Sequence, residues 1–214
     1  MNPLLEISPL PNHAPPFDKI ANEHYMPAVE EGIKQARANI EAIKNNAAAP
    51  DFDNTIAALE SASELLGQAT GIFYNQLACM GGDDLQELAE KIGPVGSNFS
   101  TDVIQDEKLF ARVKAVHDRM EKLTLTPEQK TLLDDTYKSF VRGGALLNED
   151  KKKRLREIDE QLSVLSPIIM NNVVKSAESF EMIIEDKKDL SGLPDMAVTA
   201  AAHEAEERGH KGKY

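Results

Sequence analysis

The chain has 214 residues, of which 41% are hydrophobic, 28% are charged and 5% are aromatic, and it contains no tryptophan. This length suits one large soluble domain or a domain and a half, with ample material for a core. The net charge of −12 at pH 7 argues against binding to nucleic acid or to an anionic membrane, because lysine and arginine are needed to neutralise phosphate groups. We therefore expect no nucleic-acid partner and no membrane partner.

Cys79 is the single cysteine, so no internal disulfide can form. It lies between Leu77 and Met80 and has no flanking histidine or basic residue, so we interpret it as a small buried hydrophobe rather than a nucleophile. No stretch is long and apolar enough to span a membrane, and the first residues lack the basic head and apolar run of a signal peptide. The sequence predicts a cytoplasmic protein, or a periplasmic one if a signal peptide was removed.

Residues 1–20 are predicted to form an extended arm over the surface, because five prolines forbid a regular helix: Pro3, Pro9, Pro11, Pro15 and Pro16. A helix is expected from about Asn22, with Pro27 tolerated in its opening turn, to near Asn45–Asn46. Asp53 is predicted to cap the next helix, which would run to Gly81–Gly82 with apolar residues at coiled-coil-like spacing. These two helices should pack antiparallel.

A third helix is expected to begin at Asp83 or Asp84. Gly93–Pro94 would kink it, although two shorter helices would also fit. Apolar residues between Leu109 and Leu123 predict a fourth helix.

The residues that start and end helices are clearest from Thr126 onward. Thr126 and Gln129 form a predicted capping box with Pro127 at the first helical position, and Gly143–Gly144 should end that helix. Asn148 is predicted to cap the next helix, which carries an apolar stripe and a predicted bend at Pro167: Leu155, Ile158, Leu162, Leu165 and Ile169, running toward Val173.

Phe180 to Glu185 is the one strand-like run, and a lone strand cannot satisfy its own backbone groups. We expect it to be exposed or paired with another molecule. Pro194 should start a last helix that Gly209 ends. The predicted fold class is therefore all-α: an antiparallel multi-helix bundle over residues 21–178, preceded by the arm and followed by the strand-like segment and terminal helix of residues 179–214.

One group of residues invites a metal-site hypothesis. His203, Glu207 and His210 would share one face of a continuous helix, since they are spaced by four and three. Gly209 argues against that continuity, and an exposed helix end of mixed charge is the favoured interpretation. Lys151–Arg154 is a basic run, but acidic neighbours indicate the solvated face of a helix.

The remaining candidates are isolated. His13, His24 and His117 have no second ligand or nucleophile at usable spacing, so each is interpreted as a surface or core histidine. Tyr137 and Asn171–Asn172 receive no role. The apolar stripes of the helices are assigned to core packing rather than to a cofactor pocket. The sequence therefore assigns no catalytic, cofactor-binding or metal-binding residue within the chain.

The run from Leu125 to Asp195, "LTPEQKTLLDDTYKSFVRGGALLNEDKKKRLREIDEQLSVLSPIIMNNVVKSAESFEMIIEDKKDLSGLPD", resembles the amino-terminal part of the thimet-type zinc oligopeptidases. Residues 1–33, "MNPLLEISPLPNHAPPFDKIANEHYMPAVEEGI", and residues 50–66, "PDFDNTIAALESASELL", look more like the dipeptidyl carboxypeptidase (peptidyl-dipeptidase) branch than the oligopeptidase A branch. The resemblance covers nearly the whole chain.

The resemblance implies that the intact protein is a zinc metallopeptidase that releases dipeptides from the carboxyl ends of short peptides. In that family zinc is held by His-Glu-x-x-His on a helix plus a later glutamate, far downstream, and this spacing is absent here. The chain would then be a wall of the substrate channel, inactive alone, leading to a missing carboxyl-terminal catalytic lobe. Apolar surface facing that lobe would be exposed and could form a dimer. The alternative is a non-catalytic helical module that binds a protein partner through its apolar grooves.

Overall fold

A computed structural model describes residues 2–214 of the chain. It divides into two compact units, Met1–Ile168 and Ile169–Tyr214, which are described separately here. The regular elements of residues 2–214 are helices, and no strand occurs among them, so the predicted all-α class is confirmed. The predicted division at residues 20 and 178 concerns the domains of an intact protein and stays a prediction.

The proline-rich start forms four short 3-10 turns rather than an α-helix: η1 (Pro3–Leu5), η2 (Pro11–His13), η3 (Phe17–Lys19) and η4 (Asn22–His24). Leu4 is buried in the core, and the side chain of Asn2 donates a hydrogen bond to the carbonyl of His24 at 2.8 Å. These contacts tie the start of the chain to the entry of the first long helix. The extended course predicted for the whole arm stays a prediction.

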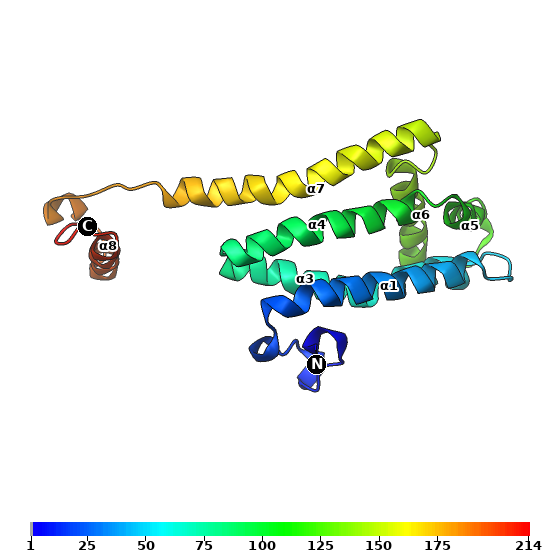
Figure 1. Cartoon of the computed structure of the whole chain (residues 1–214), viewed down its shortest axis with the longest axis horizontal. Helices are drawn as coiled ribbons and strands as arrows, with labels where there is room; N and C mark the ends of the chain where they lie inside the picture. The colour runs from blue at the N-terminus through cyan, green and yellow to red at the C-terminus, as the bar shows by residue number, and fades with distance from the viewer. Residues whose placement is uncertain (1) are drawn as a thin grey trace. The chain divides into compact units, whose positions relative to one another are not determined.

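Helix α1 (Tyr25–Lys44) packs along α3 (Glu64–Met80), and the chain turns back between them through a π-helical segment, η5 (Phe52–Ala57), and a short helix, α2 (Ala58–Ser61) (Figure 1). The two long helices approach closely at Gly32, where a Cβ atom would lie 2.8 Å from the Cα of Leu66. Only glycine fits there, because the neighbouring atom belongs to a backbone.

Three predictions about this region are wrong. The single helix expected from Asp53 to Gly81–Gly82 is interrupted, because α2 ends at Ser61 and α3 begins at Glu64. The cap is Asp51 and not Asp53: Asp51 accepts a hydrogen bond from the Asn54 N–H at 2.7 Å, and the Asn54 side chain accepts one from the Asp51 N–H at 3.1 Å. Asn54 therefore completes a reciprocal box that Asp53 could not form. Cys79 is exposed and not buried, because the last turn of α3 extends past its packing neighbours, where Met80 is 74% exposed.

The next helices can be compared with the predicted helix starts and ends. Helix α4 (Asp83–Ile104) continues through Pro94 as one element, so the alternative of two shorter helices is wrong. Helix α5 (Glu107–His117) and a 3-10 turn, η6 (Met120–Lys122), precede α6 (Pro127–Arg142). The capping box of α6 is confirmed, since Thr126 and Gln129 exchange hydrogen bonds of 3.0 and 3.3 Å. Gly144 takes a φ of 96° just after α6 ends.

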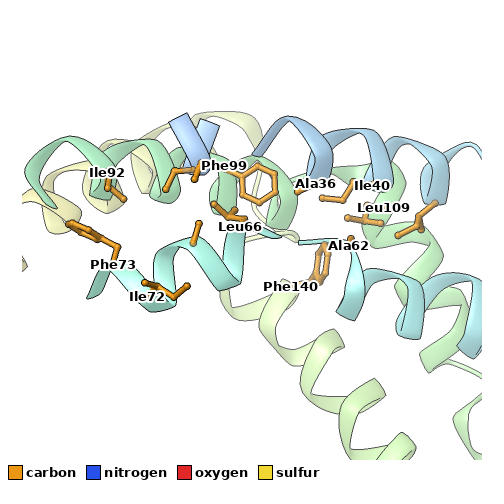
Figure 2. Packing of buried hydrophobic residues seen from close by; sticks show 14 of the residues in the cluster. Ala36, Ile40, Ala62, Leu66, Ile72, Phe73, Ile92, Phe99, Leu109 and Phe140 are labelled. Atoms are coloured by element: carbon orange, nitrogen blue, oxygen red, sulfur yellow. The ribbon is translucent and has the colours of Figure 1, made fainter. Parts of the chain in front are cut away.

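The core of the first unit is a continuous cluster of aliphatic and aromatic side chains drawn from α1 to α6 (Figure 2). The Tyr25 ring meets the Phe73 ring edge-on, with 5.1 Å between centroids, and Phe110 stacks on Phe140 at 5.9 Å. Burial of these rings and of the aliphatic side chains around them supplies the main driving force for folding of the unit.

Helix α7 (Glu149–Glu178) begins where predicted, with the Asn148 side chain accepting a hydrogen bond from the Lys151 N–H at 3.0 Å, and it continues through Pro167. Its apolar stripe was expected to pack in the core, and that expectation is wrong: Leu162 is 53% exposed, and Lys152 is the only buried side chain of α7. At Gly93 of α4 a Cβ would lie 3.1 Å from the carbonyl oxygen of Ser163. The backbone of α7, rather than its stripe, therefore faces α4 there.

The second unit holds a 3-10 turn, η7 (Lys187–Leu190), and α8 (Asp195–Glu207). The strand-like residues 180–185 are exposed as expected, but their expected lack of a partner within the chain is wrong. The Ile184 N–H donates to the Tyr214 carbonyl at 2.8 Å, and the Tyr214 N–H donates to the Ile184 carbonyl at 3.0 Å. Gly209 and Gly212 have positive φ angles of 87° and 80° after α8, which lets the chain return to Ile184.

Candidate functional site

The first unit carries an open groove of about 810 Å³. Helices α3, α4 and α6 supply most of its lining, with contributions from α1 and α2. Its floor includes buried side chains of the hydrophobic core: Ile40, Leu66, Ile92, Phe99 and Phe140, all labelled in Figure 2. The volume lies in the range of ligand-binding clefts.

Hydroxyl groups and two carboxylates surround this apolar floor. Ser97, Ser100 and Ser139 line the groove with short hydroxyl side chains. Glu60 and Asp135 are exposed at the groove, and neither forms an ion pair within residues 2–214. No lysine, arginine or histidine is among the lining residues. The groove thus offers apolar contact, hydrogen-bonding groups and negative charge to a bound molecule.

A second cluster, made of ion pairs, attaches the start of α7 to α1, α4 and α5. Asp102 of α4 is paired with Arg37 of α1 at 2.6 Å and also with Arg156 of α7. Burial alone would raise the pKa of Asp102, but hydrogen bonds from Arg156 and Arg37 outweigh it and hold the pKa below its usual value. The buried ammonium of Lys152 lies 2.9 Å from Glu107 and 3.1 Å from Glu149, and these hydrogen bonds raise the pKa of Lys152.

Replacing Asp102 with asparagine tests this cluster. A lowered pKa in the folded state means that the carboxylate stabilises the fold above its unfolded pKa of about 3.9, and that this stabilisation disappears as the pH falls through the folded pKa. At pH 7 we expect Asp102→Asn to reduce the free energy of unfolding by about 1 kcal/mol. As the pH falls below about 4, the difference in the free energy of unfolding between wild type and variant should decrease steadily, as measured by urea unfolding at several pH values.

The control for this test is Asp118→Asn, because Asp118 pairs only with Lys114, four residues earlier on the surface. It should cost less than about 0.5 kcal/mol at any pH. A difference between wild type and Asp102→Asn that stays constant from pH 7 to pH 3 would show that the carboxylate charge is not what stabilises the cluster.

The structure does not bring the hypothetical metal ligands together. Helix α8 ends at Glu207, and Gly209 with its positive φ takes His210 off the helix face that carries His203. His203 lies 3.7 Å from Glu207, whereas His210 lies 3.3 Å from Glu181. Within residues 2–214 no group of three histidine, cysteine, aspartate or glutamate side chains could hold a metal ion.

The isolated histidines have local partners. His24 accepts the Ala21 N–H at 2.9 Å, and His13 lies 2.9 Å from the Ser8 carbonyl. His117 stacks on Tyr137 with 3.9 Å between ring centroids. Sequence reasoning missed the groove, because its lining combines residues of α1, α2, α3, α4 and α6 that lie far apart in the sequence, and no short motif marks it.

The molecule is thus an all-helical protein with an open, acidic-rimmed apolar groove, and no described helix is both long and apolar enough to cross a membrane. No protein-family model matches the chain. It is 37% identical over 214 residues to a dipeptidyl carboxypeptidase of Escherichia coli K12, and 38% identical over 208 residues to a dipeptidyl carboxypeptidase of Salmonella typhimurium LT2. It is also 30% identical over 211 residues to an oligopeptidase A of Escherichia coli K12.

These alignments cover 100%, 97% and 99% of this chain but only 31%, 31% and 30% of the relatives. The chain therefore spans about a third of the length of the curated relatives that it matches. The predicted resemblance to the dipeptidyl carboxypeptidase and oligopeptidase A family is confirmed, with higher identity to the dipeptidyl carboxypeptidases.

Proposed function

We propose that this chain is the amino-terminal helical part of a zinc metallopeptidase of the dipeptidyl carboxypeptidase type. In this proposal the intact enzyme removes dipeptides from the carboxyl ends of short peptides in the cytoplasm, and the helices of this chain form one wall of the channel that selects peptides by size. The observation that carries the proposal is the similarity to a dipeptidyl carboxypeptidase over the whole chain, at 37% identity, which accounts for only 31% of that relative.

The donor groups of the chain do not suit a zinc site. Zinc in a hydrolase requires three protein ligands that converge on one point, with an open position for water. The described residues present no such set, and His203 and His210 are engaged by different glutamates. In the proposed enzyme zinc is therefore held by residues outside this sequence, and the contribution of this chain is to bind and exclude substrates.

Activity measurements separate this proposal from its alternative. The purified chain should release no dipeptide from an amino-blocked short peptide when zinc is supplied, because residues 2–214 present no set of ligands for the metal and its water. A protein made from the same gene, read past the codon for Tyr214 through a His-Glu-x-x-His segment, should release carboxyl-terminal dipeptides. Dipeptide release by the pure chain would contradict the inactive role.

The alternative is a non-catalytic helical interaction module, which the exposed apolar side chains of α7 and the groove both favour. A reading frame that ends at Tyr214 would support the module and contradict the peptidase. Dimerisation through the exposed apolar surface stays a prediction, and light scattering that shows only monomer over a broad concentration range would contradict it.

A further inference from the structure

The groove between α3, α4 and α6 has a composition that selects the charge of its occupant. Its floor is apolar, and its only ionisable carboxylates, Glu60 and Asp135, have no basic neighbour among the lining residues. The guanidinium of Arg37 lies 5.5 Å from the centre of the Phe99 ring but is already paired with Asp102. An acidic occupant would meet two unneutralised carboxylates, whereas a basic one would neutralise them.

The walls of the groove are kept open by small residues. Gly67 on α3 and Gly96 on α4 both line it, and a Cβ atom added at either position would meet no atom within 4 Å. Ser97, Ser100 and Ser139 add short hydroxyl side chains to the same walls. An elongated apolar surface can therefore lie directly against the helices, in the manner of an amphipathic helix that enters a hydrophobic groove.

We propose that this groove is a docking site for a basic amphipathic helix supplied by a partner protein. The apolar face of that helix would cover the core side chains at the floor, and lysine or arginine residues beside that face would pair with Glu60 and Asp135. The overall charge of −12 adds attraction over distance and would accelerate association at low ionic strength. The inference does not depend on the proposed peptidase function, because it uses only residues of the groove.

Binding of designed peptides to the full 214-residue chain tests this site. The probes are three fluorescent 18-residue helical peptides: a leucine, alanine and lysine peptide with one apolar face, the same peptide with glutamate for lysine, and a scrambled lysine peptide without an apolar face. Fluorescence anisotropy should show saturable one-to-one binding of the first, at least about tenfold tighter than of the other two. Equal binding of the three peptides would overturn the proposal.

Two leucine substitutions on the same helix locate the bound peptide. Gly67→Leu places a side chain in the groove, whereas Gly71→Leu, one turn later on α3, places it in open space outside the lining. A Cβ atom at either position would meet no atom within 4 Å, so we expect both variants to fold as wild type does, which circular dichroism and thermal melting would check. We expect Gly67→Leu to weaken binding at least about tenfold and Gly71→Leu to change it less than about twofold. Equal effects of the two variants would overturn the proposal.

A double variant tests whether Glu60 and Asp135 select the charge of the bound peptide. The preference is the ratio of the dissociation constants of the glutamate peptide and the lysine peptide. The double variant Glu60→Gln and Asp135→Asn should reduce this ratio by at least about threefold. Added salt should also reduce it in the wild-type chain. An unchanged ratio would show that these carboxylates do not select the charge of the peptide.

A longer product of the same gene tests which molecule occupies the groove. If that product no longer bound the lysine peptide, one of its own segments would be the occupant, and the proposed partner protein would be excluded. None of these results depends on dipeptide release, so failure here and failure of the peptidase proposal are distinguishable.

Discussion

Replacing Arg112 with leucine should lower the free energy of unfolding by about 3 kcal/mol, although Arg112 forms no ion pair within residues 2–214. The side chain is buried in α5 and donates to the Asn46 carbonyl and to the Asn54 side-chain oxygen, both at 3.0 Å. A longer contact of 3.4 Å reaches the Ala48 carbonyl. Leucine would remove the Arg112 donor from the Asn46 and Ala48 carbonyls, while the Asn54 side-chain oxygen would keep the Asp51 N–H and the Thr55 hydroxyl as donors. The loss of several hydrogen bonds from one buried guanidinium is the reason for the large expected effect.

Urea or guanidinium unfolding measures this effect, and Arg119→Leu is the matched control. Arg119 also binds the same segment, through the Pro50 carbonyl, but it is exposed, so water can replace its hydrogen bond. The control should lose less than about 1 kcal/mol. If the two variants lost the same stability, the loop from Asn45 to Asp51 would not depend on the buried guanidinium for its conformation.

Gly32→Ala should destabilise the protein by about 2 kcal/mol or more. Its new methyl group would lie 2.8 Å from the Cα, 3.0 Å from the N and 3.1 Å from the Cβ of Leu66. Because the backbone of α3 cannot move aside as a flexible side chain can, α1 and α3 would have to separate along the contact that organises the core. Thermal melting should show a lowered midpoint together with a loss of aromatic circular dichroism from the Tyr25–Phe73 contact.

Gly71→Ala, on α3, should increase the free energy of unfolding rather than lower it. A Cβ at position 71 meets no atom within 4 Å, so alanine should stabilise α3 by about 0.5–1 kcal/mol through its higher helix propensity. A loss of stability in both variants would mean that glycine is needed for backbone conformation rather than for the close approach of two helices.

Local chemistry made several helix ends predictable. The Thr126 and Gln129 box, the Asn148 cap and the stop at Gly143–Gly144 each depend on neighbouring residues alone, and each is present in the structure. The same logic failed at Asp53, because two acidic residues stand on either side of Phe52 and only Asp51 has an asparagine three positions later. Choosing between them required weighing Asn54 as a capping partner.

Features that depend on the packing of several helices could not be predicted from neighbouring residues alone. The stripe of α7 has the same helical spacing as the buried stripes of α1 and α4, and spacing alone cannot show whether a neighbouring helix covers it. The groove is equally hidden in the sequence, since Glu60, Gly67 and Asp135 meet only once three helices are packed. The family resemblance, by contrast, could be predicted, because it is spread over almost every segment of the chain.

The first turns of α7 are attached to the rest of the first unit chiefly by ion pairs, and this attachment should weaken as the salt concentration rises. Mobile ions screen charges over about 8 Å at physiological ionic strength. They reach both sets of ion pairs, because Arg156 is 38% exposed and the two carboxylates that face Lys152, those of Glu107 and Glu149, are 78% and 84% exposed. Rising ionic strength should therefore weaken the attachment of the first turns of α7, while the apolar contact between α1 and α3 is unaffected.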